Sequence, residues 1–134
     1  MSDFQISTNA TGVAQDTRWR WSAHGEDSAR PGQLDISTLD AQHIVNGRAP
    51  SGLALGQITA SKLYGPYDAS ASDGREVLAG YLNDNIGPEI VVGGKPTIAV
   101  LKHGIIKASL LPIASQRAAV ITADTTGSFT YVED

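Results

Sequence analysis

Residues 49–82, APSGLALGQITASKLYGPYDASASDGREVLAGYL, decide the fold. Residues 53–59 are mainly apolar and follow a Pro-Ser-Gly turn, so they predict a strand. Residues 76–82 predict a second, buried strand. Between them, residues 64–75 are rich in Gly, Pro, Asp and Ser and predict a long connection made of turns. This pattern favours short strands joined by turns over long helices.

The flanking sequence continues this pattern. Lys102-His103-Gly104 lies between two apolar segments, and a glycine there can supply the positive φ of a tight turn, so we expect a hairpin. The one plausible helix is residues 112–124, which begin with Pro and are rich in Ala. Further strands are predicted at residues 34–39, 89–92, 97–101, 105–108 and 129–132. The expected class is mainly β (α+β): a small compact β-rich domain with one short helix.

Composition narrows the range of functions. The chain has 134 residues, which favours a single domain. Its formal net charge is −4 with only 10 Lys and Arg, which argues against nucleic-acid binding and against docking on an anionic membrane. It has no cysteine, so it has neither a disulfide framework nor a thiolate metal site.

Residues 1–33 differ from the remainder of the chain. They hold few large apolar side chains, yet they contain both tryptophans, Trp19 and Trp21. Such a segment cannot bury enough area to offset an ordering cost of roughly 1–2 kcal/mol per residue. We therefore expect a mobile N-terminal arm at residues 1–33 and a folded domain at residues 34–134.

The two tryptophans allow two interpretations. In an extended arm Trp19 and Trp21 share one face, and Arg18 and Arg20 share the other. They could cap an edge of the protein's own core. They could instead anchor the arm on a partner, because Trp and Arg are enriched at binding hot spots and an extended arm can pair with a sheet edge.

Catalytic and metal motifs are weak. His24, His43 and His103 are not spaced as metal ligands. Residues 93–97, GGKPT, fail the spacing of a phosphate loop, and residues 68–74, DASASDG, match a calcium loop only loosely. We expect no catalytic, cofactor-binding or metal-binding residue. The alternative is a small ligand-binding or hydrolytic β domain that uses the 64–75 loop, with the side chains Asp68, Asp73, Arg75 and His103.

Three segments, 49–60, 63–68 and 72–82, carry the pattern P-S-G-x-x-L-G-x-I-T, Y-G-P-Y-D and D-G-R-x-x-x-G-x-L. This pattern resembles the lambda-type head decoration (capsid-stabilising) proteins of tailed bacteriophages. The resemblance covers about residues 34–114, and the arm mainly by position and character. The motif residues are Pro50, Ser51, Gly52, Tyr64, Gly65, Pro66, Tyr67, Asp68, Asp73, Gly74 and Arg75.

The resemblance implies a structural virion protein rather than an enzyme. Family members bind expanded heads as homotrimers at three-fold sites, on the outer surface of the capsid, and stabilise the shell against DNA pressure. The implied partners are the major capsid protein and further copies of the chain, which is made in the host cytoplasm. The arm, with Arg18, Trp19, Arg20 and Trp21, is then the segment expected to dock on the shell. A tail or fibre adaptor is less favoured, because the chain has neither repeats nor heptads.

Overall fold

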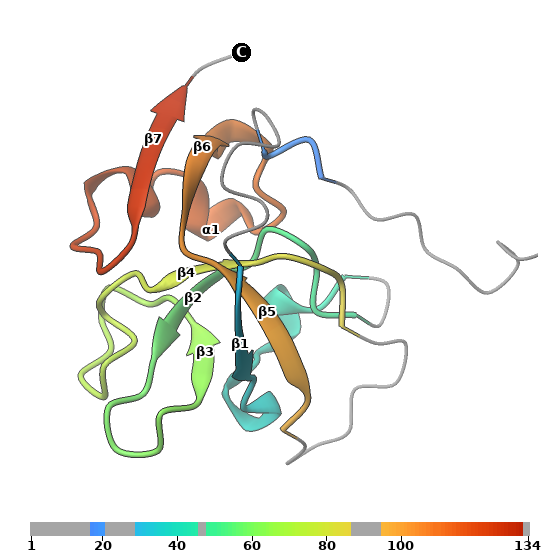
Figure 1. Ribbon diagram of the computed structural model, residues 1–134, viewed down its shortest axis with the longest axis vertical. Coiled ribbons are helices and arrows are strands. Elements are labelled where there is room, and N and C mark those ends of the chain that lie inside the picture. Colours follow the sequence, from blue (N-terminus) through green and yellow to red (C-terminus); the bar gives the residue numbers. More distant parts are fainter. Residues whose placement is uncertain (1–16, 21–28, 46–47, 87–94, 133–134) are drawn as a thin grey trace, which may run out of the picture.

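The structure, a computed structural model, describes residues 17–20, 29–45, 48–86 and 95–132. Within these ranges, seven strands form two sheets, accompanied by one short helix, α1 (Ala114–Arg117) (Figure 1). The larger sheet is antiparallel, in the order β1 (Arg30–Gln33), β5 (Thr97–Leu101), β4 (Gly80–Leu82), β2 (Ala54–Gln57) and β3 (Tyr64–Pro66). The smaller sheet pairs β6 (His103–Lys107) in parallel with β7 (Ser128–Val132). The predicted fold class, a small β-rich domain with one short helix, is confirmed.

Both faces of the larger sheet are buried at its centre. Successive side chains of a strand point to opposite faces, so Leu55 and Ala54 belong to different apolar clusters. The first cluster contains Leu34, Leu53, Leu55, Leu82 and Val100. The second contains Trp19, Tyr81, Leu101, Ile106, Leu111 and Val120 and lies between the two sheets and the α1 region. This two-sided burial explains why the central strands are almost continuously apolar.

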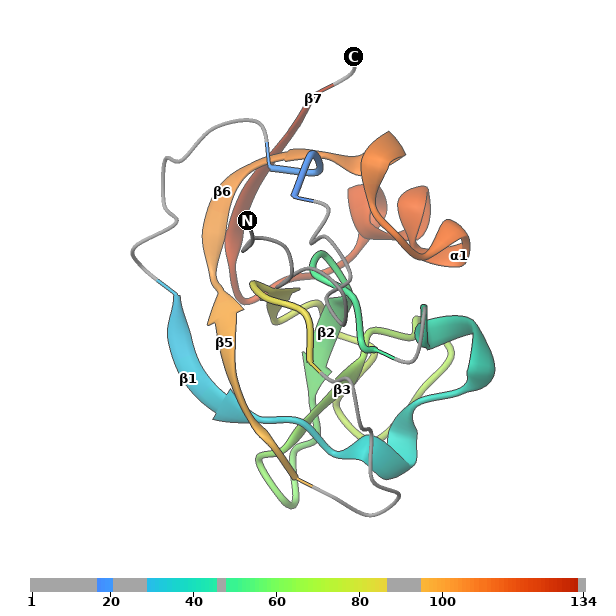
Figure 2. The ribbon, with the colours of Figure 1, turned by 90° about the vertical axis from the view of Figure 1, so that its right-hand side faces the viewer.

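The predicted hairpin around Lys102 is wrong. β5 and β6 follow one another directly, but they belong to different sheets. Both edges of β5 are occupied, one by β1 and the other by β4, so no edge remains for β6. The chain instead continues past Lys102, and β6 pairs with β7 (Figures 1 and 2).

The predicted strand at residues 34–39 is also wrong. Ile36–Thr38 form a 3₁₀ turn, and only Leu34 makes an isolated bridge, to Tyr64. The carboxylate of Asp35 accepts hydrogen bonds from the backbone N–H and the hydroxyl of Ser37, at 3.1 and 2.6 Å. The N–H groups of Ser37, Thr38 and Leu39 are thus all satisfied within the turn, without a partner strand, and this overrides the alternating pattern.

Other elements agree in place and differ in length. β2 and β7 confirm the strands predicted at residues 53–59 and 129–132, while the strand predicted at residues 76–82 is paired only at Gly80–Leu82. The helix predicted at residues 112–124 is broken into α1 and a 3₁₀ segment, Ala119–Thr122, which contains three β-branched residues. The strand predicted at residues 89–92 lies outside the described residues.

The predicted boundary between arm and domain is displaced. β1 pairs along its full length with β5, so residues 30–33 are an edge strand of the domain and not part of an arm. Residues 17–20 also contact the domain: Arg20 bridges Ile106 of β6, and the backbone N–H of Lys107 donates to the carbonyl of Trp19 at 2.7 Å. Residues 1–16 and 21–28, where the remainder of the expected arm falls, lie outside the described residues.

Candidate functional site

The family-motif segments pack against one another around Arg75. Gly56 lies under the backbone of Arg75, so closely that a Cβ at Gly56 would stand 2.5 Å from the Cα of Arg75. A Cβ at Gly65 would stand 2.9 Å from Cδ of the Arg75 side chain. Gly74 has φ +118°, a conformation that L side chains rarely adopt, and it lies against the carbonyl of Gln57. These glycines are therefore required to place the 68–75 loop on strands β2 and β3.

The acidic residues of this loop stabilise its turns. The carboxylate of Asp68 accepts from the backbone N–H and the hydroxyl of Ser70, at 2.9 and 2.7 Å, and these bonds lower the pKa of Asp68. Asp73 accepts from the backbone N–H of Arg75 and forms a 3.1 Å ion pair with its Nε, which together lower the pKa of Asp73. Both carboxyl groups thus have structural partners within two residues along the chain.

The Pro50-Ser51-Gly52 motif holds the N-terminal segment. The hydroxyl of Ser51 accepts from the indole N–H of Trp19 at 3.1 Å and donates to the carbonyl of Asn83 at 2.9 Å. Gly52 has φ +94°, and a Cβ there would stand 2.8 Å from Cδ1 of the Trp19 ring. Ser51 and Gly52 therefore shape the site that Trp19 fills.

The aromatic motif residues are core residues. Tyr64 is 7% exposed and packs in the first apolar cluster, and Tyr67 is 6% exposed and packs in the second. Pro50 and Pro66 are also buried. None of these four side chains presents a free surface to a ligand.

The predicted docking residues separate into different environments. Trp19 is fully buried in the second apolar cluster, with its ring centroid 5.6 Å from that of Tyr81, as the core interpretation expects; in this position its ring is not exposed to a partner. Burial of the indole ring inside the domain stabilises the fold, and Ser51 accepts the hydrogen bond of the indole N–H there. Arg20 donates to Asn83 at 2.6 Å, and Arg18 is exposed. Trp21 lies outside the described residues.

The sequence suggested His103 as the histidine of the 64–75 loop, but the structure has His43 near this loop. His103 lies on β6 opposite Ser128 of β7. His43, in a 3₁₀ turn, has Asp40, Arg75 and Asp68 as its charged neighbours. It is 8% exposed, and its Nδ1 accepts from the backbone N–H of Asp40 at 3.0 Å. Burial lowers the pKa of His43, which favours the neutral ring.

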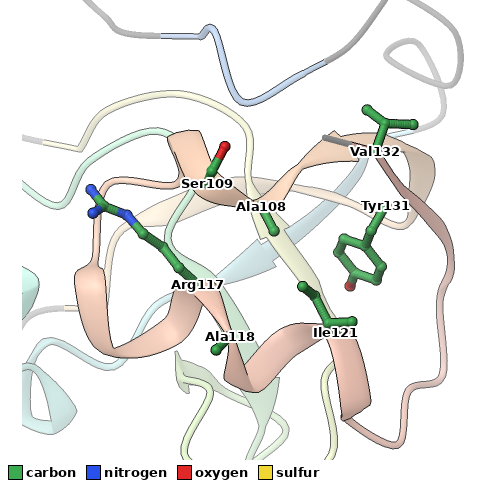
Figure 3. Close-up of a pocket in the computed structure, with 7 residues that line it drawn as sticks. All are labelled: Ala108, Ser109, Arg117, Ala118, Ile121, Tyr131 and Val132. Atoms are coloured by element: carbon green, nitrogen blue, oxygen red, sulfur yellow. The ribbon is translucent and has the colours of Figure 1, made fainter. Parts of the chain in front are cut away.

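Sequence reasoning missed two features of the C-terminal region. Gln116 is buried and hydrogen-bonds the backbone of Ala54 and Tyr67. A groove of about 740 Å³ lies between the α1 region and the smaller sheet (Figure 3). The sequence signal that could have indicated this groove is an apolar side chain that remains exposed in the predicted helix. That side chain is Ile121, which is 54% exposed.

Within the described ranges, no group of three or more His, Asp or Glu side chains is placed to hold a metal ion. No helix among the same residues is long and apolar enough to cross a membrane. Among known proteins, no family model, no curated protein and no solved structure matches the chain.

Proposed function

We propose that the protein is a bacteriophage capsid decoration protein, not an enzyme. It binds as a homotrimer at the three-fold sites of the expanded head, on the outer surface of the virion, and stabilises the shell against DNA pressure. Its partners are the major capsid protein and two further copies of itself. The net charge of −4 accords with a surface that contacts neither nucleic acid nor membrane.

The observation that carries this proposal is the way the motif segments interlock. Gly56, Gly65 and Gly74 are each required by the fit of the 68–75 loop on β2 and β3, and Ser51 and Gly52 by the fit of Trp19. Such a motif specifies a fold rather than a reaction. This supports membership of a family whose shared residues build a structural domain.

The place of residues 17–20 supports a shorter docking arm than the sequence suggested. Trp19 is buried in the core of the domain, so we assign the docking arm to residues 1–16. Residues 17–20 lie along β6, so in this proposal the arm is residues 1–16 and joins the domain at Thr17. Three such arms in one trimer would bind with the avidity of linked modules.

The test is co-sedimentation with expanded, undecorated heads of the cognate phage. The full chain should pellet and saturate at three copies per three-fold site, and a chain without residues 1–16 should stay in the supernatant. Deletion of residues 1–33 is unsuitable, because it removes Trp19 and β1 from the domain. Unexpanded heads serve as the matched control, since the proposed site forms only where expanded subunits meet.

Two checks make the result decisive. Circular dichroism of the shortened chain should show the same fold as the full chain and a cooperative thermal transition, which shows that the missing arm and not a damaged domain abolishes binding. Failure of the full chain to pellet on expanded heads contradicts the proposal. In that case the ligand-binding alternative at residues 64–75 becomes the working hypothesis, and there the structure groups His43 rather than His103 with Asp68 and Arg75.

A further inference from the structure

The groove between the smaller sheet and the α1 region is apolar and partly uncovered. It is lined by Ala108, Ser109, Arg117, Ala118, Ile121, Tyr131 and Val132 (Figure 3). Among the described residues, two large apolar side chains are exposed, Val45 and Ile121. Ile121 is the more exposed of the two, at 54%. The hydroxyl of Tyr131 is fixed by a 2.7 Å hydrogen bond to Tyr81, so this wall of the groove is preformed. An apolar surface of this kind is usually covered by something.

One edge of the groove is also an open strand edge. β7 pairs with β6 and with no other strand among the described residues. A two-stranded sheet is marginal by itself, and alternate backbone N–H groups of β7 point away from β6. An extended segment laid beside β7 would satisfy these groups and, at the same time, place its side chains over the groove.

The strand register shows which end of the groove faces the start of the described N-terminal segment, residues 17–20. Arg20 forms an antiparallel bridge to Ile106 of β6. Thr17 therefore lies further along β6 than Arg20, on the side of Ser109. Because β6 and β7 are parallel and Lys107 lies opposite Val132, that end of β6 is also the end of the groove formed by Val132. Figure 3 shows residues 17–20 (blue) on the same side as Ser109 and Val132. Thr17, from which the chain continues to residues 1–16, therefore lies towards the Ser109 end of β6.

The sequence of these sixteen residues fits the groove. Phe4 and Ile6 are two apart, so in an extended conformation both side chains point to one face. Asp3 precedes them, and the exposed Arg117 on the groove rim offers the opposite charge. Sixteen residues reach up to about 50 Å, and a short tether gives an effective concentration on the order of millimolar.

We propose that in the free protein residues 3–7 dock on this groove of their own chain, beside β7, with Phe4 and Ile6 covering Ile121 and Tyr131. The segment closes the open edge of the smaller sheet and the apolar surface together. This inference concerns the isolated chain and does not depend on capsid binding. If the chain also decorates heads, the docked segment must be released before it reaches the shell.

Amide hydrogen exchange, followed by NMR on the full chain without heads, tests this docking. Three proteins are compared: the wild type, the double variant Phe4→Ser/Ile6→Ser, and the control Gln5→Ser, whose side chain points to the opposite face. The double variant should exchange the outward-facing amides of β7 at least tenfold faster than the wild type. Gln5→Ser should not. The amides of Leu55 and Tyr81 in the larger sheet should stay strongly protected in all three proteins, which shows that the domain remains folded.

Each other result overturns the proposal. Equal exchange of β7 in all three proteins means that the segment does not cover it. Equal acceleration by Gln5→Ser means that the protection does not come from one face of the segment. Protection of β7 that grows with protein concentration over a tenfold range means that a second copy covers the edge instead.

Discussion

The indole N–H of Trp19 donates a 3.1 Å hydrogen bond to the hydroxyl of Ser51, and this bond joins residues 32 apart along the chain. The same hydroxyl donates to the carbonyl of Asn83, so three segments meet at one oxygen. Burial of the indole and satisfaction of its N–H occur together here. Residues 17–20, which the sequence assigned to a mobile arm, are thus tied into the core by Trp19.

Substitution Trp19→Ala should lower the free energy of unfolding by about 3–5 kcal/mol, because it leaves a large cavity in the second apolar cluster. The neighbouring Arg18→Ala is the matched control, since Arg18 is exposed, and it should cost at most about 1 kcal/mol. Urea unfolding followed by circular dichroism measures both changes. Equal stability of the two variants would show that Trp19 does not belong to the core.

The side-chain amide of Gln116 binds the backbone of two strand ends. Its Oε1 accepts from the N–H of Ala54 at 2.9 Å, and its Nε2 donates to the carbonyls of Ala54 and Tyr67, each at 3.2 Å. Gln116→Leu keeps the bulk but leaves these buried groups without this partner, so we expect a loss of about 2–4 kcal/mol in urea unfolding. Ser115→Ala, which removes an exposed bond to Gln42, should cost under about 1 kcal/mol. If both variants unfold alike, the buried amide contributes nothing.

The sequence predicted the apolar central strands and missed the edges. β1 contains Pro31-Gly32, and β3 contains Gly65-Pro66, which local rules assign to turns. Both strands are the outer strands of the larger sheet, where a proline without an N–H is tolerated. Whether a strand lies at an edge depends on the pairing of distant segments, which propensity cannot supply.

The candidate site was predictable in its residues but not in its contacts. The glycines of the motif mark close approach, and the structure gives each a partner, such as Arg75 over Gly56. The acidic loop residues were correctly placed in turns, with Asp68 capping Ser70. The burial of Trp19 was left open, because its acceptor, Ser51, is 32 residues away. The spacing of His43 shows no metal pair, and the charged residues near it, Asp40, Asp68 and Arg75, come together only on folding.

Gly74→Ala should strain the motif loop. The residue has φ +118°, and an added Cβ would overlap the carbonyl of Gln57 and the hydroxyl of Thr59. We expect a loss of at least about 2 kcal/mol in thermal or urea unfolding, from backbone strain and the clash together. Ser72→Ala, in the exposed part of the same loop, should change stability by less than about 0.5 kcal/mol. An unchanged stability of Gly74→Ala would mean that the loop does not need the left-handed conformation.

The stability of the protein should depend on pH through His43. Burial is the main cause that lowers the pKa of His43 below 6.5, and Arg75 adds to it, whereas Asp40 and Asp68 oppose it. The unfolded chain therefore binds this proton more tightly than the folded chain. It follows that stability falls as the pH drops below about 6.5, with a slope of at most about 1.4 kcal/mol per pH unit. Protonation of Nδ1 also breaks its bond from the Asp40 N–H.

Urea unfolding at several pH values between 7 and 5 measures this slope. His43→Gln offers an amide oxygen to the N–H of Asp40 but does not titrate, so its slope in this range should be much smaller than that of the wild type. Gln42→Ala, an exposed and non-titrating neighbour in the same 3₁₀ turn, is the matched control and should keep the wild-type slope. The carboxyl groups of Asp68 and Asp73 have lowered pKa values, so their contribution is lost only at more acidic pH. A wild-type slope in His43→Gln would therefore assign the pH dependence to another group and contradict the prediction.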